Sequence, residues 1–570
     1  AGTVGYEFGA LLNGIFIDGR NRRAFTNLYH RFVGGPLDPD EVIYHAKRLI
    51  MMSSLSSEIT VLSHRMEEIS STDRRARDFT RHALTEAIRE TIACFPVYRT
   101  YIDERGNISE RDRMYIQQAV AQAKRRNPGL PTATYDFLRD ILLLEMGESR
   151  VSAENYRKRL YFTLKFQQLT GPVMAKGLED TACYVYNRLV SVNEVGSSPK
   201  EFGVSVDEFH EGNLERLRDW PHSMLNTSTH DSKRSEDVRA RLNVLSEMPQ
   251  TWGAQALRWR RANRSRKRTL SDGRMVPDHN EEYLLYQTLA GAWPFDIEAP
   301  GARQNFTRRI AQYMTKAVHE AKINLSWTNQ NPEYVAALEA FIDDVLKPDG
   351  KARRNRFLEQ LEPFAETVGF FGVFNSLAQV LLKVTSPGVP DIYQGQELWD
   401  FSLVDPDNRL PVDFEARQTM LSHLLPHSEA ADRAQLASEL LSHYRDGRVK
   451  MWTTVQALRF RTRAGELFRA GNYIPVRASG AKQEHVVAFA RELNWRMAVT
   501  VAPRLVYTLT GGKMEVPVGG VWGETELALP GNSPERFENV LTGEVVDCRG
   551  GRILCRELFR TFPLALLSGR

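Results

Sequence analysis

The sequence predicts an α/β protein: part of a (β/α)8 barrel with large helical insertions, followed by a C-terminal β-sandwich domain. Three observations lead to this prediction. Helical periodicity dominates the first part of the chain, two short apolar segments end in polar tips that precede helices, and short alternating segments separated by Gly-rich turns fill the end. A chain of 570 residues is long enough to form two or three packed units.

The first part of the chain has a helical pattern. Apolar residues recur at spacings of three and four between about Asp40 and Ala93, which predicts consecutive amphipathic helices. The short aromatic and β-branched segment FPVYRTYI at 95–102 predicts a strand or an extended segment between helices. Helical patterning resumes at 109–170, whereas 171–196 mixes Gly, charges and aromatics without a clean period, which indicates a functional loop.

Two segments carry the barrel prediction. LNTSTHD at 225–231 is typical of a short strand with a polar tip, and a charged turn leads from it into a helical pattern. LLKVTSPGVPDIYQGQEL at 381–398 contains a short apolar segment bracketed by Pro and Gly that also ends in polar groups. Two such transitions from strand to helix favour a (β/α) barrel.

The last part of the chain predicts helices and then strands. Helical patterning returns after about Glu415 and continues to roughly Tyr444, and the alternating segments HVVAFAR, RMAVTVAP and GRILCRELF then predict a small β-sandwich. The sharpest change in composition, near 407–415, marks the expected end of the barrel. The expected organisation is a barrel segment at 1–20, a helical insertion at 21–170, the C-terminal part of the barrel at 171–414, a helical connection at 415–455 and the sandwich at 456–570.

Composition excludes several classes of partner. The 75 basic and 71 acidic residues nearly balance, so no global field selects a polyanion and a neutral substrate fits well. The four cysteines lack the spacing of a zinc or redox motif, so we expect free thiols in a reducing cytoplasm and no metal. No run of eighteen apolar residues and no signal-peptide pattern occurs, so we expect no membrane span.

His230 and Asp231 stand at the first predicted strand end. In a (β/α) barrel such positions converge on one mouth. Glycosyl transfer needs an acid, a nucleophile or base, and groups that grip sugar hydroxyls, and a His-Asp pair suits the gripping role. The alternative, a pair that only caps the next helix, has about equal weight on spacing alone.

Longer strings resemble one family. WPHSMLNTSTHDSKRSEDVRARL at 220–242 resembles the fourth signature of the α-amylase superfamily, in the form used by maltooligosyltrehalose synthases. Five further strings resemble the same family in consistent order and span most of the chain: GTVGYEF at 2–8, FPVYRTY at 95–101, TGPVMAKGLEDTACYVYNRLVSVNEVG at 170–196, NEEYLLYQTLAGAWP at 280–294 and PGVPDIYQGQELWDFSLVDPDNR at 387–409.

The resemblance implies an isomerase of trehalose biosynthesis. This family converts the reducing-end α-1,4 linkage of a maltooligosaccharide to α,α-1,1 and yields a maltooligosyltrehalose without a cofactor. The chemistry resembles that of retaining glycosidases, except that the released glucose turns within a closed pocket and attacks in place of water. A helical insertion over the barrel mouth, as the early helices suggest, would exclude that water.

The resemblance also implies roles for residues around Asp231. Asp231 matches the third carboxylate of the family, a transition-state stabiliser, and His230 matches its hydroxyl-binding neighbour. Lys233 and Arg234 are expected to hold the loop. Three residues of the irregular loop are candidates for holding the glucose that rotates, the alternative being a surface salt-bridge cluster: Lys176, Glu179 and Asp180.

Other substrate-binding candidates come from three further segments. Arg99 and Tyr101 either line the pocket or form a cation–π stack in the scaffold. At the second strand end we expect Tyr393, Gln396 and Glu397 to contact sugar or to support the site, and the resemblance argues against Glu397 as the acid. Lys322 and Trp327 are candidates for binding further glucose units, the alternative for Trp327 being a core position.

The nucleophile Asp and the acid/base Glu of the superfamily have no match in this sequence. The nearest patterns, RLRDW at 216–220 and DDVLKPD at 343–349, do not follow strand-like segments. In the family both carboxylates precede the GTVGYEF-like string, so we expect them upstream of Ala1, in an N-terminal part of the enzyme. The family pattern also often has Arg-Arg where Arg409-Leu410 stands here.

Three alternative functions remain open. A related α-glucan hydrolase or glucanotransferase would let water or a second sugar intercept the same intermediate. An inactive glucan-binding fragment would bind maltooligosaccharides without turnover. The basic run RWRRANRSRKR at 258–268 suggests a nucleic-acid-binding protein as a third alternative, but a solvated helix face explains this run more simply.

Overall fold

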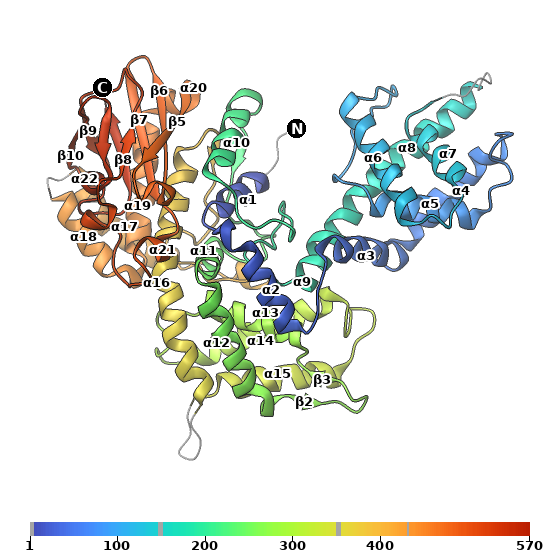
Figure 1. Cartoon of the computed structure of the whole chain (residues 1–570), viewed down its shortest axis with the longest axis horizontal. Coiled ribbons are helices and arrows are strands. Elements are labelled where there is room, and N and C mark those ends of the chain that lie inside the picture. Colours follow the sequence, from blue (N-terminus) through green and yellow to red (C-terminus); the bar gives the residue numbers. More distant parts are fainter. Residues whose placement is uncertain (1–4, 146–151, 349–354, 430–431, 570) are drawn as a thin grey trace. The chain divides into compact units, whose positions relative to one another are not determined.

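The structure is a computed structural model that describes residues 5–145, 152–348, 355–429 and 432–569. It is mostly helical and ends in an antiparallel sheet (Figure 1). The chain forms two compact units: unit 1 consists of Ala1–Gly35, Asn187–Ala317 and Gln330–Arg570, and unit 2 of Pro36–Tyr186 and Val318–Asn329.

Unit 2 is a helical bundle. Its main helices are α3 (Pro39–Met52), α4 (Ser56–Ser71), α5 (Arg81–Ala93), α6 (Glu110–Arg126), α7 (Thr132–Leu142) and α8 (Ala153–Met174). The predicted succession of amphipathic helices is confirmed, and the side chains of Thr80, Ser109 and Ser152 cap the N-termini of α5, α6 and α8. The segment 95–102 forms no strand, and it connects α5 to α6 as irregular backbone.

A π-helix follows α8. This element, η2 (Ala175–Ala182), leads into the short helix α9 (Cys183–Val185). Helix α3 approaches η2 closely at Gly177, where a Cβ atom would lie 2.9 Å from the Cα of Lys47. The segment predicted as an irregular functional loop thus contains a π-helix, a rare element that is frequent at functional sites.

Helix α16 (Arg356–Thr385) is the central helix of unit 1. It packs against α11 (Glu236–Val244), α13 (His279–Ala292) and α19 (Arg448–Arg463). It is the one helix of the described ranges that is long and apolar enough to cross a membrane, but 94% of that apolar window is buried inside the protein. We therefore describe α16 as a core helix.

The two predicted strand ends of the barrel lie side by side. Strand β1 (Met224–Leu225) pairs in parallel with β4 (Val389–Pro390), with Met224 opposite Val389. Gly388, with φ 127°, permits this approach, because a Cβ atom there would lie 2.7 Å from the Leu225 side chain. Within the described ranges this is the one parallel pair, so the structure contains at most a part of the predicted barrel.

The C-terminal strands form one continuous sheet. Its order is β10 (Val545–Asp547), β9 (Arg536–Asn539), β12 (Ala565–Gly569), β7 (Arg496–Pro503), β6 (Val486–Leu493), β5 (Asn472–Ser479), β8 (Glu526–Ala528) and β11 (Arg552–Leu554), all antiparallel. The strands were predicted, but the two stacked sheets of a sandwich are replaced by one sheet, because β5 pairs with β6 through 472–476 and with β8 through 477–479.

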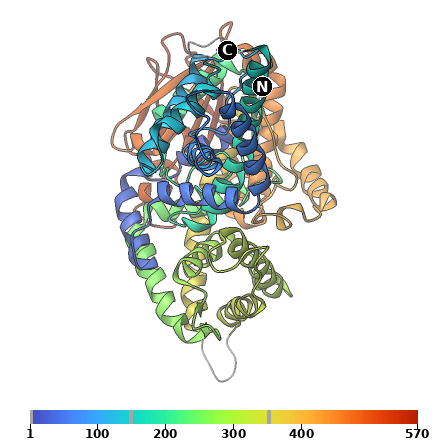
Figure 2. The same ribbon diagram turned by 90° about the vertical axis from the view of Figure 1, so that its right-hand side faces the viewer.

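The remaining elements belong to unit 1, apart from the last residues of α14, and they include the helices predicted after Glu415. In both views the C-terminal strands lie at one end of unit 1 and α15 at the other (Figure 1 and Figure 2). These elements are α1 (Tyr6–Gly14), α2 (Arg22–Val33), α10 (Val206–Asp219), α12 (Pro249–Asn263), β2 (Arg268–Thr269), β3 (Met275–Val276), α14 (Ala302–Ala321), α15 (Pro332–Leu346), α17 (Phe414–Leu424), α18 (Arg433–Ser442), α20 (Gly465–Ala470), α21 (Val506–Leu509) and α22 (Cys555–Leu558).

The basic run at 258–268 is partly engaged inside unit 1. Arg260 donates to the backbone oxygen of Phe32 at 2.8 Å, and Arg266 donates to the side-chain oxygen of Asn355 at 3.0 Å. Lys267 is buried against the carboxylate of Glu282, at 2.5 Å. These contacts leave fewer free charges for a polyanion than the sequence suggests.

Candidate active site

Asp231 and His230 lie on the turn that follows β1. Their side chains are 55% and 58% exposed, and His230 Nε2 lies 3.3 Å from Asp231 Oδ2. The backbone N–H of Asp231 donates to Thr229 Oγ1 at 3.1 Å, which fixes the turn. Arg409 Nη2 is 3.8 Å from Asp231 Oδ1. The carboxylate is thus held in place yet open to a ligand.

Asn408 connects the two strand ends. Its Nδ2 donates to the backbone oxygen of His230 at 3.1 Å, with further oxygens of the same turn at 3.3 and 3.4 Å. Its own backbone oxygen accepts the hydroxyl hydrogen of Tyr393 at 3.0 Å. Tyr393, predicted as a substrate contact, therefore supports the segment that holds the turn of Asp231.

The other predicted residues of the second strand end are tied to their own segment. Glu397 accepts from Arg417 Nε at 3.1 Å, which occupies one of its carboxylate oxygens. Gln396 is 1% exposed, and its Nε2 lies 3.4 Å from Asp400 Oδ2. Both side chains contact residues near them in the sequence, and the two roles expected for them, sugar contact or support of the site, stay predictions.

Lys233 and Arg234 are buried beneath the turn. Arg234 donates to the backbone oxygen of Asn193 at 3.2 Å and to the hydroxyl of Tyr313 at 2.6 Å. Its guanidinium group is thus engaged inside the protein, and Lys233 is equally buried, at 4% exposure. The loop-holding role expected from the resemblance stays a prediction for both residues.

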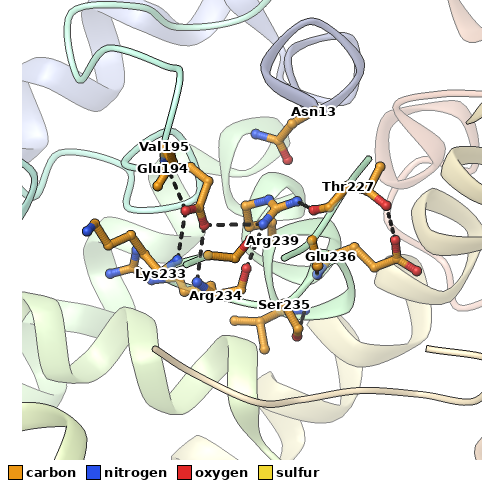
Figure 3. Close-up of polar contacts among 12 residues, drawn as sticks. Asn13, Glu194, Val195, Thr227, Lys233, Arg234, Ser235, Glu236 and Arg239 are labelled. Atoms are coloured by element: carbon orange, nitrogen blue, oxygen red, sulfur yellow. Dashed lines mark hydrogen bonds and ion pairs between the residues drawn. The ribbon is translucent and has the colours of Figure 1, made fainter. Parts of the chain in front are cut away.

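Glu194 organises the backbone after Asp231 (Figure 3). Its carboxylate accepts the backbone N–H of Lys233 at 2.7 Å and of Arg234 at 3.1 Å, and it contacts Arg239 Nη1 at 3.2 Å. It also accepts the N–H of Val195 at 3.0 Å. Sequence reasoning missed Glu194, although it stands in the family-like string at 170–196.

A buried charge cluster anchors the start of α11. Lys450 Nζ lies 2.8 Å from both Glu236 Oε1 and Asp237 Oδ2, and Lys383 Nζ lies 3.2 Å from Glu236 Oε2. Burial would raise the pKa of Glu236, but the two lysines outweigh it and lower that pKa. Asp237 also accepts the N–H of Asp400 at 2.8 Å, which fastens the second strand-end segment to α11.

Two cavities differ in what they can hold. A cavity of about 30 Å³, with Asn13, Glu194 and Asn226 among its lining residues, has room for water but not for a sugar. A pocket of about 310 Å³ lies beside the second strand end, and Trp399, Phe401 and Asn408 are among its lining residues. Aromatic faces next to polar groups suit a pyranose ring.

Three predicted segments of unit 2 meet at η2. Lys176 Nζ lies 2.7 Å from Asp180 Oδ2 on the surface, and Lys322 Nζ donates to Thr181 Oγ1 at 3.1 Å. The hydroxyl of Tyr98 donates to the buried carboxylate of Glu179. We call these groups the η2 cluster. It contains the ion pair of Lys176 and Asp180, which fits the alternative of a surface salt-bridge cluster. It also contains polar groups from segments that are distant in the sequence.

The aromatic candidates of unit 2 are exposed. The guanidinium carbon of Arg99 lies 5.1 Å from the ring centre of Tyr101, which is 64% exposed. Trp327 stacks on His319 at 4.3 Å between ring centres, and it is 51% exposed. The alternative that placed Trp327 in the core is wrong, because its outer face is open to solvent.

Known proteins resemble this chain in sequence and in fold. No protein-family model matches the chain. A Mycobacterium tuberculosis protein provisionally named maltooligosyl trehalose synthase is 36% identical over 411 residues, which cover 71% of this chain and 45% of that protein. The solved maltooligosyltrehalose synthase of Arthrobacter ramosus matches with a TM-score of 0.79 and 30% identity, over 100% of this chain and 63% of that one.

The chain is a homologue of maltooligosyltrehalose synthases. A solved Sulfolobus tokodaii structure described as a hypothetical maltooligosyl trehalose synthase also matches, with a TM-score of 0.69, 27% identity, and coverage of 99% of this chain and 62% of that one. The chain spans less than two thirds of the length of these relatives. Within the described ranges no group of three or more His, Cys, Asp and Glu side chains is arranged to hold a metal ion.

Proposed function

We propose that this chain carries part of the active site of an enzyme that converts the reducing-end α-1,4 linkage of a maltooligosaccharide to α,α-1,1. The observation that carries the proposal is Asp231 itself. It is an exposed carboxylate at the end of a parallel strand, fastened to the neighbouring strand end by Asn408 and near Arg409. Homology to maltooligosyltrehalose synthases supports the choice of substrate and reaction.

In this proposal Asp231 is the third carboxylate and not the nucleophile. Its two oxygens accept hydrogen bonds from neighbouring sugar hydroxyls, and its charge opposes the positive charge that develops at the anomeric carbon. His230, 3.3 Å away, binds a further hydroxyl. Both groups are rigidly presented because Glu194 and Asn408 hold the backbone on either side of them.

The reaction would proceed in two steps, formation of a glycosyl-enzyme and its breakdown by the released glucose. A nucleophilic carboxylate attacks the anomeric carbon of the scissile bond while an acid protonates the departing 4-oxygen of the terminal glucose. The freed glucose then turns, and its anomeric hydroxyl attacks the glycosyl-enzyme and gives its proton back to the same acid/base group. Water must stay outside throughout, because it would give hydrolysis instead.

We propose that the nucleophile and the acid/base come from a segment of the enzyme outside these 570 residues. The support is that β1 and β4 are the one parallel strand pair in the described ranges, whereas a (β/α)8 barrel needs eight parallel strands. In unit 2 we propose that the η2 cluster, with Trp327 and Tyr101 exposed beside their stacking partners, is a sugar-binding surface. We also propose a reducing cytoplasmic setting, which is the expectation drawn from the spacing of the four cysteines in the sequence.

Product analysis on maltopentaose tests the proposal. The chain is assayed alone and together with the preceding segment of the enzyme, and products are separated by size and reducing power. A non-reducing isomer of unchanged mass, formed only when both parts are present, is the expected result. Glucose with maltotetraose would identify a hydrolase, longer glucans a glucanotransferase, and binding without any product an inactive glucan-binding protein. Isomer formation by the chain alone would refute the placement of the catalytic pair.

A further inference from the structure

The largest cavity that we describe in unit 1 is not part of the site around Asp231. It is a cleft of about 680 Å³, within the range of about 300–1,000 Å³ typical of small-molecule sites. One wall consists of 17–20 and 202–210, which includes the start of α10, and the other consists of parts of β5, β6 and the segment 504–505. Helix α10 and strand β5 lie next to each other in Figure 1.

Two ion pairs join residues that line the cleft. Arg20 Nη1 lies 2.6 Å from Glu484 Oε2, and Arg477 Nη1 lies 2.9 Å from Asp207 Oδ1. All four side chains are more than half exposed, so these pairs contribute little to stability and can exchange partners at small cost. Planar guanidinium and carboxylate groups in such pairs offer several donors and acceptors to an entering ligand.

His210 supplies a buried polar group to the cleft wall. It is 4% exposed, and its Nδ1 lies 2.7 Å from the hydroxyl of Tyr473. The same hydroxyl accepts from Asn213 Nδ2 at 3.3 Å, so its own hydrogen is satisfied only by donation to Nδ1. The proton of a neutral imidazole then resides on Nε2, and burial lowers the pKa of His210 to about 4, which keeps it neutral at pH 7.

The charges of the lining residues balance. Three carboxylates, Asp18, Asp207 and Glu484, face three guanidinium groups, Arg20, Arg477 and Arg504. Such a lining selects neither an anion nor a cation, and its four exposed charged side chains offer donors and acceptors that match hydroxyls, next to an apolar part of the lining. We propose that this cleft is a second binding site, separate from the Asp231 site, for a neutral polyhydroxyl ligand of the size of a short oligosaccharide. The choice of an α-glucan among such ligands rests on the proposed function.

The resonance of His210 provides a direct readout of the cleft. In protein labelled with ¹⁵N at histidine, the His210 signal is identified by its loss in His210→Asn, and it should show a protonated Nε2 and an unprotonated Nδ1. We expect maltotriose to shift this signal saturably. Arg477→Ala should weaken that binding about fivefold or more, since it removes charge-assisted hydrogen bonds to the ligand.

The controls separate the cleft from the Asp231 site. Arg536→Ala is the matched control, because Arg536 is likewise an exposed strand arginine paired with an aspartate, Asp547, and it should leave the shift unchanged. Asp231→Asn should also leave it unchanged, so a failure of the proposed isomerisation would not remove the cleft signal. Three results would overturn the proposal. The first is a shift of the His210 signal with inorganic phosphate but not with maltotriose, and the second is no shift with either compound. The third is an affinity for maltotriose that is the same in Arg477→Ala as in the parent protein.

Discussion

The carboxylate of Glu194 accepts the backbone N–H of Lys233 at 2.7 Å, and through this bond the segment before β1 fixes the turn that carries Asp231. The same carboxylate also holds the backbone of Arg234 and the side chain of Arg239 (Figure 3). Glu194 is thus a positioning residue, because its carboxylate holds the backbone of the turn.

Glu194→Gln should destabilise unit 1. The amide turns an NH₂ group toward donors that now contact carboxylate oxygens, and charge-assisted hydrogen bonds of this kind are worth about 1.5–3 kcal/mol. The urea midpoint of unit 1 should fall accordingly. Glu154→Gln is the control, because Glu154 is largely exposed in its pair with Lys158. An equal effect of both substitutions would contradict the role assigned to Glu194.

Asn408→Ala should loosen the turn of Asp231 without unfolding the protein. The substitution removes the side-chain donor to the His230 backbone oxygen, at a cost of about 1 kcal/mol, which corresponds to roughly fivefold faster local opening. Hydrogen–deuterium exchange of 229–235 measures this opening. Leu410→Ala, at an exposed neighbouring position, should leave the exchange unchanged.

Lys450→Met should be strongly destabilising. It leaves Glu236 and Asp237 buried with one cation fewer, and breaking a buried pair in this way typically costs about 3–5 kcal/mol. The added substitution Asp237→Asn should recover part of the loss in denaturant unfolding. Lys158→Met, in an exposed pair, is the comparison, and a loss no greater than that of Lys158→Met would argue against the cluster as an anchor.

The stability of unit 1 should carry a pH dependence from Glu247. Burial raises the pKa of Glu247 to about 7, so the folded state keeps a proton that the unfolded state loses above about pH 4.5. Its contribution to stability is full below pH 4.5 and falls as pH rises, by about 3 kcal/mol at pH 8. Glu247→Gln should therefore gain stability relative to the parent at pH 8 and not at pH 4. Parallel pH profiles of the two proteins would refute this assignment.

Asp231→Asn tests the proposed third carboxylate in the enzyme assembled with its preceding segment. A lost electrostatic contact to the transition state should lower kcat/KM for maltopentaose by about 10²–10³-fold. Because the side chain is exposed, the melting temperature should stay unchanged. Asp219→Asn removes another surface aspartate that is paired with an arginine, Arg218, and should leave activity intact.

The parts of the site that local patterns encode were predictable. Both strand ends carry a turn signal and a polar tip within about ten residues, and the structure shows that β1 and β4 pair with each other. Consecutive helices in unit 2 follow from their apolar spacing. Asp231 could be singled out from the sequence because it lies in a long and distinctive string. The contacts of its side chain could not be predicted from that string.

The partners that hold the site were not predictable, because they are distant in sequence and have no pattern of their own. Lys450 meets Asp237 across more than two hundred residues, and a lysine in a helical sequence usually indicates a solvated face. The π-helix η2 has no distinct periodicity, so the loop at 171–196 reads as irregular. Likewise, alternation predicts strands but not whether β5 joins two halves into one sheet.

The parallel pairing of Met224 with Val389 has a consequence for biosynthesis. All of α11 to α16 must be made before these two residues can meet, so the site depends on a contact of long sequence separation, which forms slowly. During translation Asp231 leaves the ribosome long before its neighbouring strand. A nascent chain arrested before Arg356 would therefore lack both the strand that pairs with β1 and the helix that covers the apolar face of α11.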